Sequence, residues 1–209
     1  GAPEAPIDLI EGSDSYYSID QVLFYRNRML PVPFSDKFKL LSNSNFRQVN
    51  ERYHINRERF VQMNESLEVA TDGNSVFFGG QRSSLIKPGE FTYLGGSYFS
   101  HGMKVYYIDW SNEEEPYQEL ESADHSSFEV LNGYYAKDKH NVYCSGGSYR
   151  LKHADPSTLE VLSANYAKDA SNVYYQSEPL PAADVTSFQV IGDRNGVDKQ
   201  KVFFQWTLI

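Results

Sequence analysis

The sequence predicts an all-β protein built from tandem copies of one short, three-stranded antiparallel meander. Apolar and aromatic residues recur along the chain with a period of about thirty residues, which is within the range of repeat architectures. Short runs of strand-forming residues alternate with Asn, Gly, Asp and Ser turns. Aromatic residues make up 15% of the 209 residues and are mainly Tyr and Phe. This length suits one domain of ordinary size or one repeat array.

The clearest meander covers residues 128–144, FEVLNGYYAKDKHNVYC. Residues 128–131 are typical of a strand, and Asn132-Gly133 supplies a turn that accepts positive φ. Residues 134–137 run back, residues 138–141 turn again, and residues 142–144 complete the meander.

The meander can be recognised elsewhere by the spacing of four positions. Counted from Phe128, an aromatic residue follows seven places on (Tyr135), an Asp ten places on (Asp138) and a Val-Tyr pair fourteen places on (Val142-Tyr143). The same spacing holds for Leu159, Tyr166, Asp169 and Val173, for Phe188, Asn195, Asp198 and Val202, and for Phe91, Tyr98, His101 and Val105.

The N-terminal copies are less regular. Three are assigned: Ile10, Tyr17, Asp20 and Phe24; then Phe46, Tyr53, Asn56 and Phe60-Val61; then a shortened copy, Leu67, Asp72 and Val76, that lacks most of its middle strand. Residues 38–41 are a rival start for the second of these copies, with an insertion after them. We therefore expect a flexible spacer at residues 1–6 and a single β-repeat domain of about seven units at residues 7–209.

The arrangement of the copies has two alternatives. A four-stranded propeller blade usually takes about forty residues, whereas this three-stranded unit has a period of about thirty. We therefore favour an open, stacked array over a closed, propeller-like ring. Both faces of a strand such as Val173-Tyr174-Tyr175 are apolar or amphipathic, which fits sheets that are covered on both sides by neighbouring units. Residues 206–209 are expected to form a terminal strand. Pairing of that strand with residues 7–10 would favour the ring.

A second signature precedes three of the copies. An Ala-Asp pair stands shortly before each start, and a hydroxyl residue directly precedes the start. An Asp followed by small polar residues caps one helical turn or forms an Asx-turn. We interpret the pair as the connector between meanders. The three connectors are Ala123-Asp124 with Ser127, Ala154-Asp155 with Thr158, and Ala183-Asp184 with Ser187.

The Asp of the second turn invites a functional interpretation. Asp20, Asp72, Asp138, Asp169 and Asp198 could form a calcium ladder, with Asn141 and Asn172 as further ligands. Calcium loops concentrate several oxygen ligands in one short segment, whereas each turn here offers a single carboxylate. The favoured interpretation is an Asp that accepts backbone N–H bonds within its own turn.

No catalytic, cofactor-binding or metal-binding residue is assigned from the sequence. The five His are scattered without metal-ligand spacing, and we interpret the single Cys144 as a core residue. The Gly pairs are expected in hairpins or bulges, because none opens a convincing helix. The residues concerned are His54, His101, His125, His140 and His153, and the pairs Gly79-Gly80, Gly95-Gly96 and Gly146-Gly147.

Residues 137–143, 168–175 and 198–204, each after an Ala-Asp connector and a short strand, resemble the repeat of the DKNYY family of bacterial proteins. The resemblance is good over about the last third of the chain and fades toward the N-terminus. It implies a β-rich bacterial repeat protein, often exported and without an established activity. It carries over no catalytic residues.

Three functions are weighed, of which the last is a purely structural spacer or toxin-neighbourhood protein. The first is a non-enzymatic binding or scaffold module outside the bacterial cytoplasm, periplasmic or at the cell surface, whose loops and exposed Tyr rings engage a protein or glycan partner. The second is a carbohydrate-active enzyme on a propeller-like array, which needs a deep cleft with acidic groups of perturbed pKa. The net charge of −9 argues against nucleic acid as a partner. No segment is long and apolar enough for membrane insertion, and no cofactor is implied.

Overall fold

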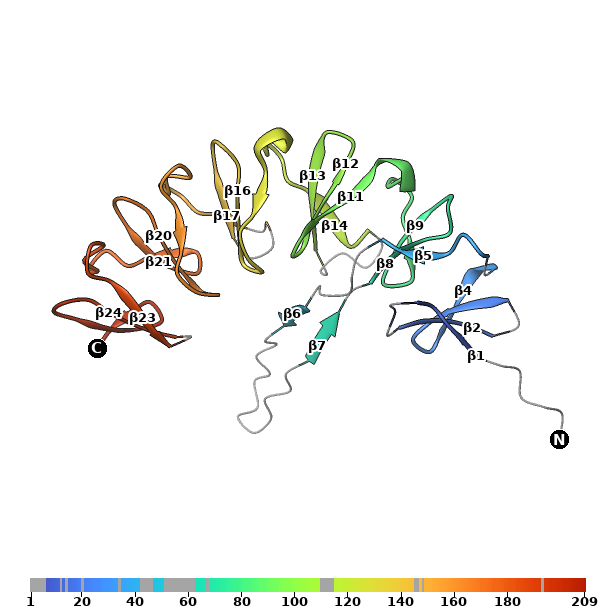
Figure 1. The fold of residues 1–209 in the computed structure, drawn as a ribbon, viewed down its shortest axis with the longest axis horizontal. Coiled ribbons are helices and arrows are strands. Elements are labelled where there is room, and N and C mark those ends of the chain that lie inside the picture. Colours follow the sequence, from blue (N-terminus) through green and yellow to red (C-terminus); the bar gives the residue numbers. More distant parts are fainter. Residues whose placement is uncertain are drawn as a thin grey trace. The chain divides into compact units, whose positions relative to one another are not determined.

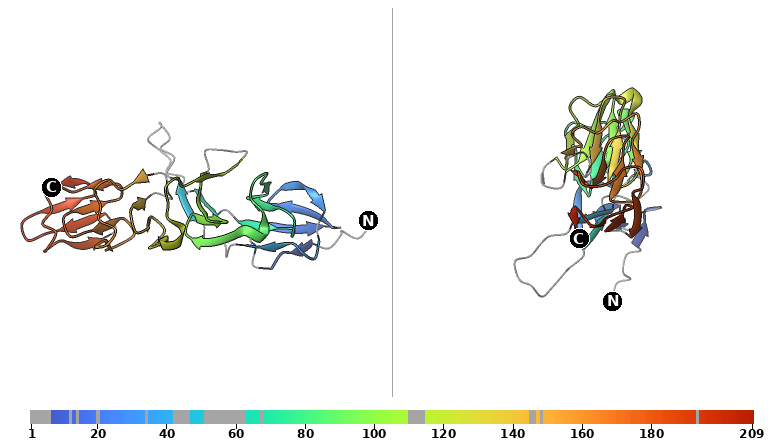
Figure 2. Two further views of the ribbon diagram at one scale, coloured as in Figure 1. Left: turned by 90° about the horizontal axis from the view of Figure 1, so that it is seen from above. Right: turned by 90° about the vertical axis from the view of Figure 1, so that its left-hand side faces the viewer.

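The computed structural model describes residues 7–11, 13, 15–19, 21–33, 35–41, 47–50, 63–66, 68–109, 115–144, 147, 149–192 and 194–209. The expected spacer, residues 1–6, therefore lies outside the described residues. Contacts divide the chain into two compact units, Gly1–Tyr93 with Asn112–Pro116 and Leu94–Ser111 with Tyr117–Ile209. Figures 1 and 2 show the elements of both units.

The first unit contains two four-stranded antiparallel sheets. Repeat 1 consists of β1 (Ile7–Leu9), β2 (Tyr16–Ile19), β3 (Val22–Tyr25) and β4 (Arg28–Pro33), in that spatial order. Repeat 2 consists of β5 (Lys39–Leu40), β8 (Val69–Thr71), β9 (Val76–Phe78) and β10 (Gln81–Arg82). Their facing sides share a core that includes Leu23, Leu30 and Phe77.

Repeat 2 is interrupted by an insertion between its first and second strands. Strand β5 pairs with β8, so residues 38–41 start the copy that the sequence analysis had treated as shortened. Its middle strand is present as β8. Between them, β6 (Arg47–Asn50) and β7 (Met63–Ser66) pair as a separate two-stranded sheet. The expected copy at Phe46, Tyr53, Asn56 and Phe60-Val61 lies outside the described residues, as do Asp20, His54 and Leu67.

The register predicted for the first copy is wrong by one residue. Tyr16, not Tyr17, takes the buried position, because Tyr16 pairs with Tyr25 as Tyr135 pairs with Cys144. The copy starts at Ile7, three residues before the predicted start at Ile10, because Leu9 pairs with Tyr17 as Val130 pairs with Ala136. Its first turn is two residues longer. The N–H of Ile10 bonds the carbonyl of Tyr16, six positions on, whereas the N–H of Leu131 bonds the carbonyl of Tyr135, four positions on.

The second unit holds most of repeat 3 and all of repeats 4 to 6, each a four-stranded antiparallel sheet. Repeat 3 consists of β11 (Phe91–Gly95), β12 (Tyr98–His101), β13 (Lys104–Ile108) and β14 (Tyr117–Glu119). Repeat 4 consists of β15 (Glu129–Val130), β16 (Tyr135–Lys137), β17 (Val142–Cys144) and β18 (Tyr149–Arg150). Repeat 5 consists of β19 (Glu160–Val161), β20 (Tyr166–Lys168), β21 (Val173–Tyr175) and β22 (Glu178–Pro179). Repeat 6 consists of β23 (Gln189–Gly192), β24 (Asn195–Val197), β25 (Val202–Phe204) and β26 (Thr207–Leu208).

The all-β meander fold is confirmed, and none of the sheets is closed into a barrel. The only helical elements among the described residues are two single 3-10 turns, η1 (Pro88–Glu90) and η2 (His125–Ser127). Each meander carries a fourth strand, which was predicted only for repeat 6, at residues 206–209. Residues 206–209 contribute β26, which pairs with β25 in its own sheet, while β1 pairs with β2. The pairing that would favour a ring is thus not made by these strands.

Successive sheets of the second unit share apolar cores. Repeat 3 packs on repeat 4 through residues such as Tyr98 and Tyr143. The next core joins Tyr135 of repeat 4 to Tyr174 of repeat 5, and the last core joins Tyr166 of repeat 5 to Phe203 of repeat 6. Each interior sheet is therefore covered on both faces. Alternation along a strand produces this, because neighbouring residues point to opposite faces.

A tyrosine hydroxyl fixes the contact between repeats 4 and 5 and the contact between repeats 5 and 6. The hydroxyl of Tyr135 donates to the carbonyls of Asn165 and Gln176 in the next repeat, at 2.8 and 3.0 Å. Tyr166 makes the same contact with the carbonyls of Arg194 and Gln205, at 3.0 and 3.4 Å. A ring that is buried with its hydroxyl bonded gains the apolar contact without leaving a polar atom unpaired.

No helix among the described residues has both the length and the apolar character that crossing a membrane requires.

Candidate functional site

The recurring Asp of the second turn organises the loop between the second and third strands. We call residues 138–141, 169–172 and 198–201 the Asp loops. In repeat 4, Oδ1 of Asp138 accepts the N–H groups of His140 and Asn141, both at 2.7 Å. Oδ2 accepts the N–H of Asp124 at 2.9 Å and the hydroxyl of Tyr143 at 2.7 Å. Both carboxylate oxygens are thus occupied by four donors of the protein itself.

The other two Asp loops repeat this arrangement with one difference. Asp169 accepts two N–H groups of its own loop, the N–H of Asp155 and the hydroxyl of Tyr174. Asp198 accepts two N–H groups of its loop and the N–H of Asp184. Phe203 stands where the other repeats have Tyr, so the fourth donor is absent there.

Each Asp loop is joined to the turn that leads into its repeat. We call residues 124–127, 155–158 and 184–187 the connector turns. Asp124 caps the 3-10 turn η2, where one of its oxygens accepts the N–H of Ser127 at 3.0 Å and the Ser126 hydroxyl at 2.5 Å. Asp155 and Asp184 bind their own Ser and Thr neighbours in the same way. The predicted role of the Ala-Asp pair as a capped connector is therefore confirmed.

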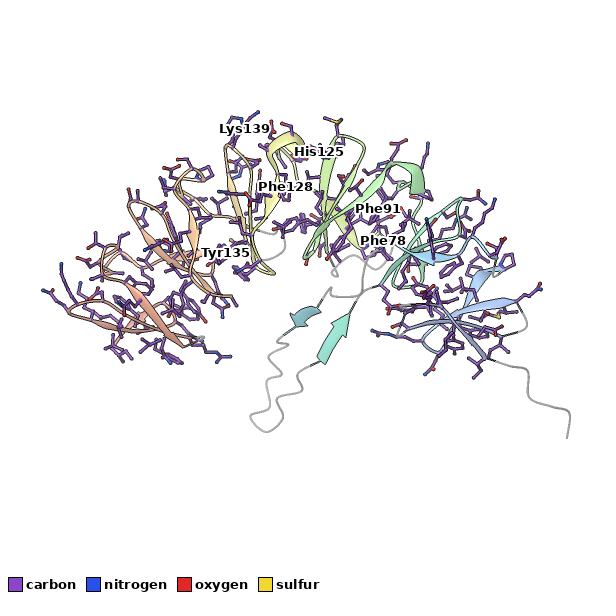
Figure 3. The ribbon with its side chains drawn as sticks, in the orientation of Figure 1. Phe78, Phe91, His125, Phe128, Tyr135 and Lys139 are labelled. Atoms are coloured by element: carbon purple, nitrogen blue, oxygen red, sulfur yellow. The ribbon has the colours of Figure 1, made fainter. Side chains whose placement is uncertain are left out.

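The hydroxyl residue before each start closes the link in the reverse direction. The Ser127 hydroxyl accepts the N–H of Lys139 at 3.1 Å. Thr158 accepts from Ala170 and Ser187 accepts from Lys199, both at 3.2 Å. Connector turn and Asp loop thus form one network on one edge of each sheet. Figure 3 shows His125 and Lys139, one from each segment, together on that edge.

A lysine covers two of the three connectors. Lys139 Nζ lies 2.7 Å from Asp124 Oδ2, and Lys199 Nζ lies 2.8 Å from Asp184 Oδ2. Repeat 5 has Ala170 at this position, and there the connector Asp155 is exposed. The three repeats are therefore natural variants of one network.

The hydrogen bonds hold these carboxylates in the charged form. Burial acts to raise the pKa of Asp138 and of Asp169, but the N–H and tyrosine donors outweigh it and the pKa of each carboxyl is lowered. The pKa of Asp124 is lowered well below its usual range by Lys139 first, then by its two serine neighbours. Burial, followed by the hydrogen bond to Asp169, raises the pKa of the Tyr174 hydroxyl. The pairs therefore stay neutral Tyr and ionised Asp across the physiological range.

This geometry supports the structural interpretation of the recurring Asp. The side chains of Asp72, Asp138, Asp169 and Asp198 each accept N–H groups of their own turn. Among the residues that the structure describes, no group of three or more His, Cys, Asp or Glu side chains could hold a metal ion. A glycosidase acid needs a raised pKa, and the carboxyl pKa values that shift here are lowered.

The four histidines that the structure describes lie on separate elements. His101 closes the β12–β13 hairpin opposite Lys104 and packs against the Tyr106 ring. His125 belongs to η2, His140 to an Asp loop and His153 to a turn with a φ of 67°.

Cys144 and the Gly pairs are structural in the described part of the chain. Cys144 is fully buried, and burial, with a minor contribution from the charge of Glu178, raises its pKa to about 12, which disfavours the thiolate. A Cβ on Gly80 would come within 2.8 Å of the Tyr25 ring, and a Cβ on Gly147 within 2.6 Å of the Tyr107 ring. These glycines let an aromatic ring of one repeat approach the backbone of the next.

The residues left for recognition are the outer ones of the network. Lys139-His140, Ala170-Ser171 and Lys199-Gln200 are exposed and differ from repeat to repeat, while the Asp that holds them is the same. The expected exposed Tyr rings are not found, because every Tyr whose burial is described is buried or half-buried. The alternation of strand residues could have indicated this, since Tyr occupies both faces of sheets that are covered on both sides.

The profile of the DKNYY family matches residues 147–207. This range contains the whole of repeat 5 and nearly the whole of repeat 6, so the resemblance is confirmed there. No curated protein matches the chain, and no solved structure does.

Proposed function

We propose, from the premise that residues 147–207 carry the DKNYY repeat, that this protein is a non-enzymatic binding or scaffold module that acts outside the bacterial cytoplasm. Its ligand would be a protein or a glycan. The contact surface would be the edge formed by the Asp loops and connector turns of repeats 4 to 6. This proposal does not depend on any single catalytic residue.

The observation that carries the proposal is that the network combines recurring framework residues with exposed residues that vary between repeats. The recurring carboxylates and hydroxyls form hydrogen bonds that hold the loop backbone. Asp138, for example, accepts four of them. The exposed neighbours change in charge and size, from Lys139 to Ala170 to Lys199. A constant framework with variable outer residues is the arrangement that repeat proteins use for recognition.

A binding screen with matched variants tests the proposal. The full chain is immobilised and exposed to bacterial cell-wall glycans and to purified envelope proteins. A variant with Lys139→Ser, His140→Ser and Lys199→Ser should lose at least about tenfold in affinity. A control variant with Glu178→Ser and Gln189→Ser changes exposed residues outside these loops and should bind normally. Equal loss in both variants, or no ligand in either class, would contradict the proposal.

The same screen distinguishes the enzyme alternative. Released oligosaccharides in the glycan incubations would show carbohydrate cleavage and overturn the non-enzymatic proposal. Location is tested separately, by expression of the protein in its bacterial host and protease treatment of intact cells. Digestion of the protein while a cytoplasmic marker stays intact would support an extracytoplasmic position, and protection of both would contradict it.

A further inference from the structure

The side of each sheet that faces the next repeat, its forward face, is apolar and recurs along the chain. In repeat 5 it is formed by Leu162, Val173, Tyr175 and Leu180, which share a core with Phe188 and Phe203 of repeat 6. Val173 is 0% exposed, Tyr175 2% and Leu180 3%. Equivalent cores join repeats 1 and 2, repeats 3 and 4, and repeats 4 and 5. One packing arrangement is therefore used four times.

The forward face of repeat 6 has the same chemistry, and none of the described residues packs over it as another repeat. Val202 corresponds to Val173, because each pairs with the last residue of the preceding strand. Ile209 corresponds to Leu180, because its N–H bonds Val202 as the N–H of Leu180 bonds Val173. The four exposed apolar side chains of this face are Ile191 (60%), Val202 (42%), Phe204 (44%) and Ile209 (75%).

Repeat 1 presents the complementary side, its backward face. Leu9 pairs with Tyr17 as Val130 pairs with Ala136. In repeat 4 this side is covered, since Val130, Ala136 and Tyr143 pack on repeat 3. In repeat 1, Ile7 is 61% and Leu9 79% exposed, and the rings of Tyr17 and Phe24 stack at 5.2 Å with both half-buried.

We infer that copies of this chain associate head to tail, with the forward face of repeat 6 docking on the backward face of repeat 1 of another copy. The contact would continue the packing that already joins one repeat to the next, so both halves of the interface are present on a single chain. Capping repeats with polar outer faces keep repeat proteins soluble, whereas the two faces described here are apolar. Contiguous exposed apolar residues mark interaction surfaces.

The interface would be heterologous, because two different surfaces meet. Such contacts produce open chains of copies unless the rotation closes a ring. Association would therefore continue past the dimer as the protein concentration rises. A symmetric dimer, in which the same face is used twice, would contradict the inference.

Sedimentation of face-specific variants tests the inference. The forward variant carries Phe204→Lys and Ile209→Lys, and the backward variant carries Ile7→Lys and Leu9→Lys. All four side chains are exposed, and circular dichroism checks that each variant is folded. Each change lowers the net negative charge of the chain, so loss of association could not be attributed to stronger repulsion between copies. Met103→Lys, at a 75% exposed loop position off both faces, is the control.

The wild type and the Met103→Lys control should grow beyond the dimer between about 1 and 500 μM, and each face variant alone should stay monomeric. An equimolar mixture of the two face variants retains one intact pair of faces, so it should form a 1:1 dimer and stop there. A monomeric wild type over the whole range would overturn the inference. So would association of either variant alone at the wild-type level, or a mixture that stays monomeric.

Discussion

Repeats 5 and 6 have the same sheet, the same Asp loop and the same connector, yet their forward faces differ sharply in burial. Tyr175 of repeat 5 is 2% exposed and its counterpart Phe204 of repeat 6 is 44% exposed. The strands of repeat 6 form without a following repeat, because they pair within their own sheet. The difference shows that hydrogen bonds within a repeat are enough to form its sheet, whereas the apolar forward face is buried only when the next repeat packs on it.

Truncation of the two counterpart rings gives the largest expected contrast. Tyr175→Ala removes a ring that packs on Tyr166 and Trp206, and it should lower the free energy of unfolding by about 3–5 kcal/mol. Phe204→Ala removes a ring that is already half in water and should cost less than about 1.5 kcal/mol. Urea denaturation of both variants measures the contrast. Equal costs would show that the neighbouring repeat does not supply the burial.

Removal of the charge from the Asp loop should have the next largest effect. In Asp169→Asn the remaining oxygen can still accept the loop N–H groups, but the Tyr174 hydroxyl loses its carboxylate acceptor. A buried hydroxyl without an acceptor costs about 1–3 kcal/mol. Asp198→Asn should cost less, because Phe203 has no hydroxyl to leave unpaired. Denaturation of the two variants tests this order, and a larger loss for Asp198→Asn would refute it.

Acid should reduce the difference between the wild type and Asp169→Asn. The pKa of Asp169 is lower in the folded state than its ordinary value, so its contribution is fully present above the unfolded pKa of about 3.9. That contribution is lost as the pH falls through the folded pKa. Thermal unfolding between about pH 6 and pH 2 should show the two proteins converging at the acid end. A constant gap would mean that the charge of Asp169 does not matter.

The lysine that covers the connector gives the smallest expected effect. Ala170→Lys would give repeat 5 the ion pair that Lys139 and Lys199 make with Asp124 and Asp184. Exposed ion pairs contribute little and are screened by salt. We expect a small rise in Tm at low ionic strength that disappears at high salt. A rise that persists at high salt would indicate a contribution other than the ion pair.

The repeat spacing was enough to predict the hairpins, the Asp-capped turns and most of the core. Alternation along a strand determines which residues face each neighbouring repeat. An Asp side chain beside small polar residues accepts the backbone N–H groups of its own turn. The four-position pattern therefore located β16–β17, β20–β21 and β24–β25 correctly. It also indicated that the recurring Asp is structural.

Other features of the fold could not be predicted from the spacing of residues in the sequence. The fourth strand is two residues long in repeats 4 and 5, and a period of two cannot be recognised over two residues. In repeat 6 the apolar residues 206–209 did predict it. In repeat 1 the first strand starts three residues before the predicted Ile10 and the first turn is two residues longer, so Tyr16 takes the place predicted for Tyr17. The first strand of repeat 2 lies far upstream of its partner β8, so a fixed spacing could not connect them. The tyrosine–carbonyl contacts between repeats depend on packing that only the structure shows.

Amide hydrogen exchange of β21 and β25 in the intact chain tests the central claim most directly. Both are central strands with a partner on each side, so their ladders are matched and only the cover on their faces differs. In dilute solution the amides of Val202–Phe204 should exchange about tenfold faster or more than those of Val173–Tyr175. Equal protection of the two strands would contradict the claim that each repeat is buried by the one that follows it.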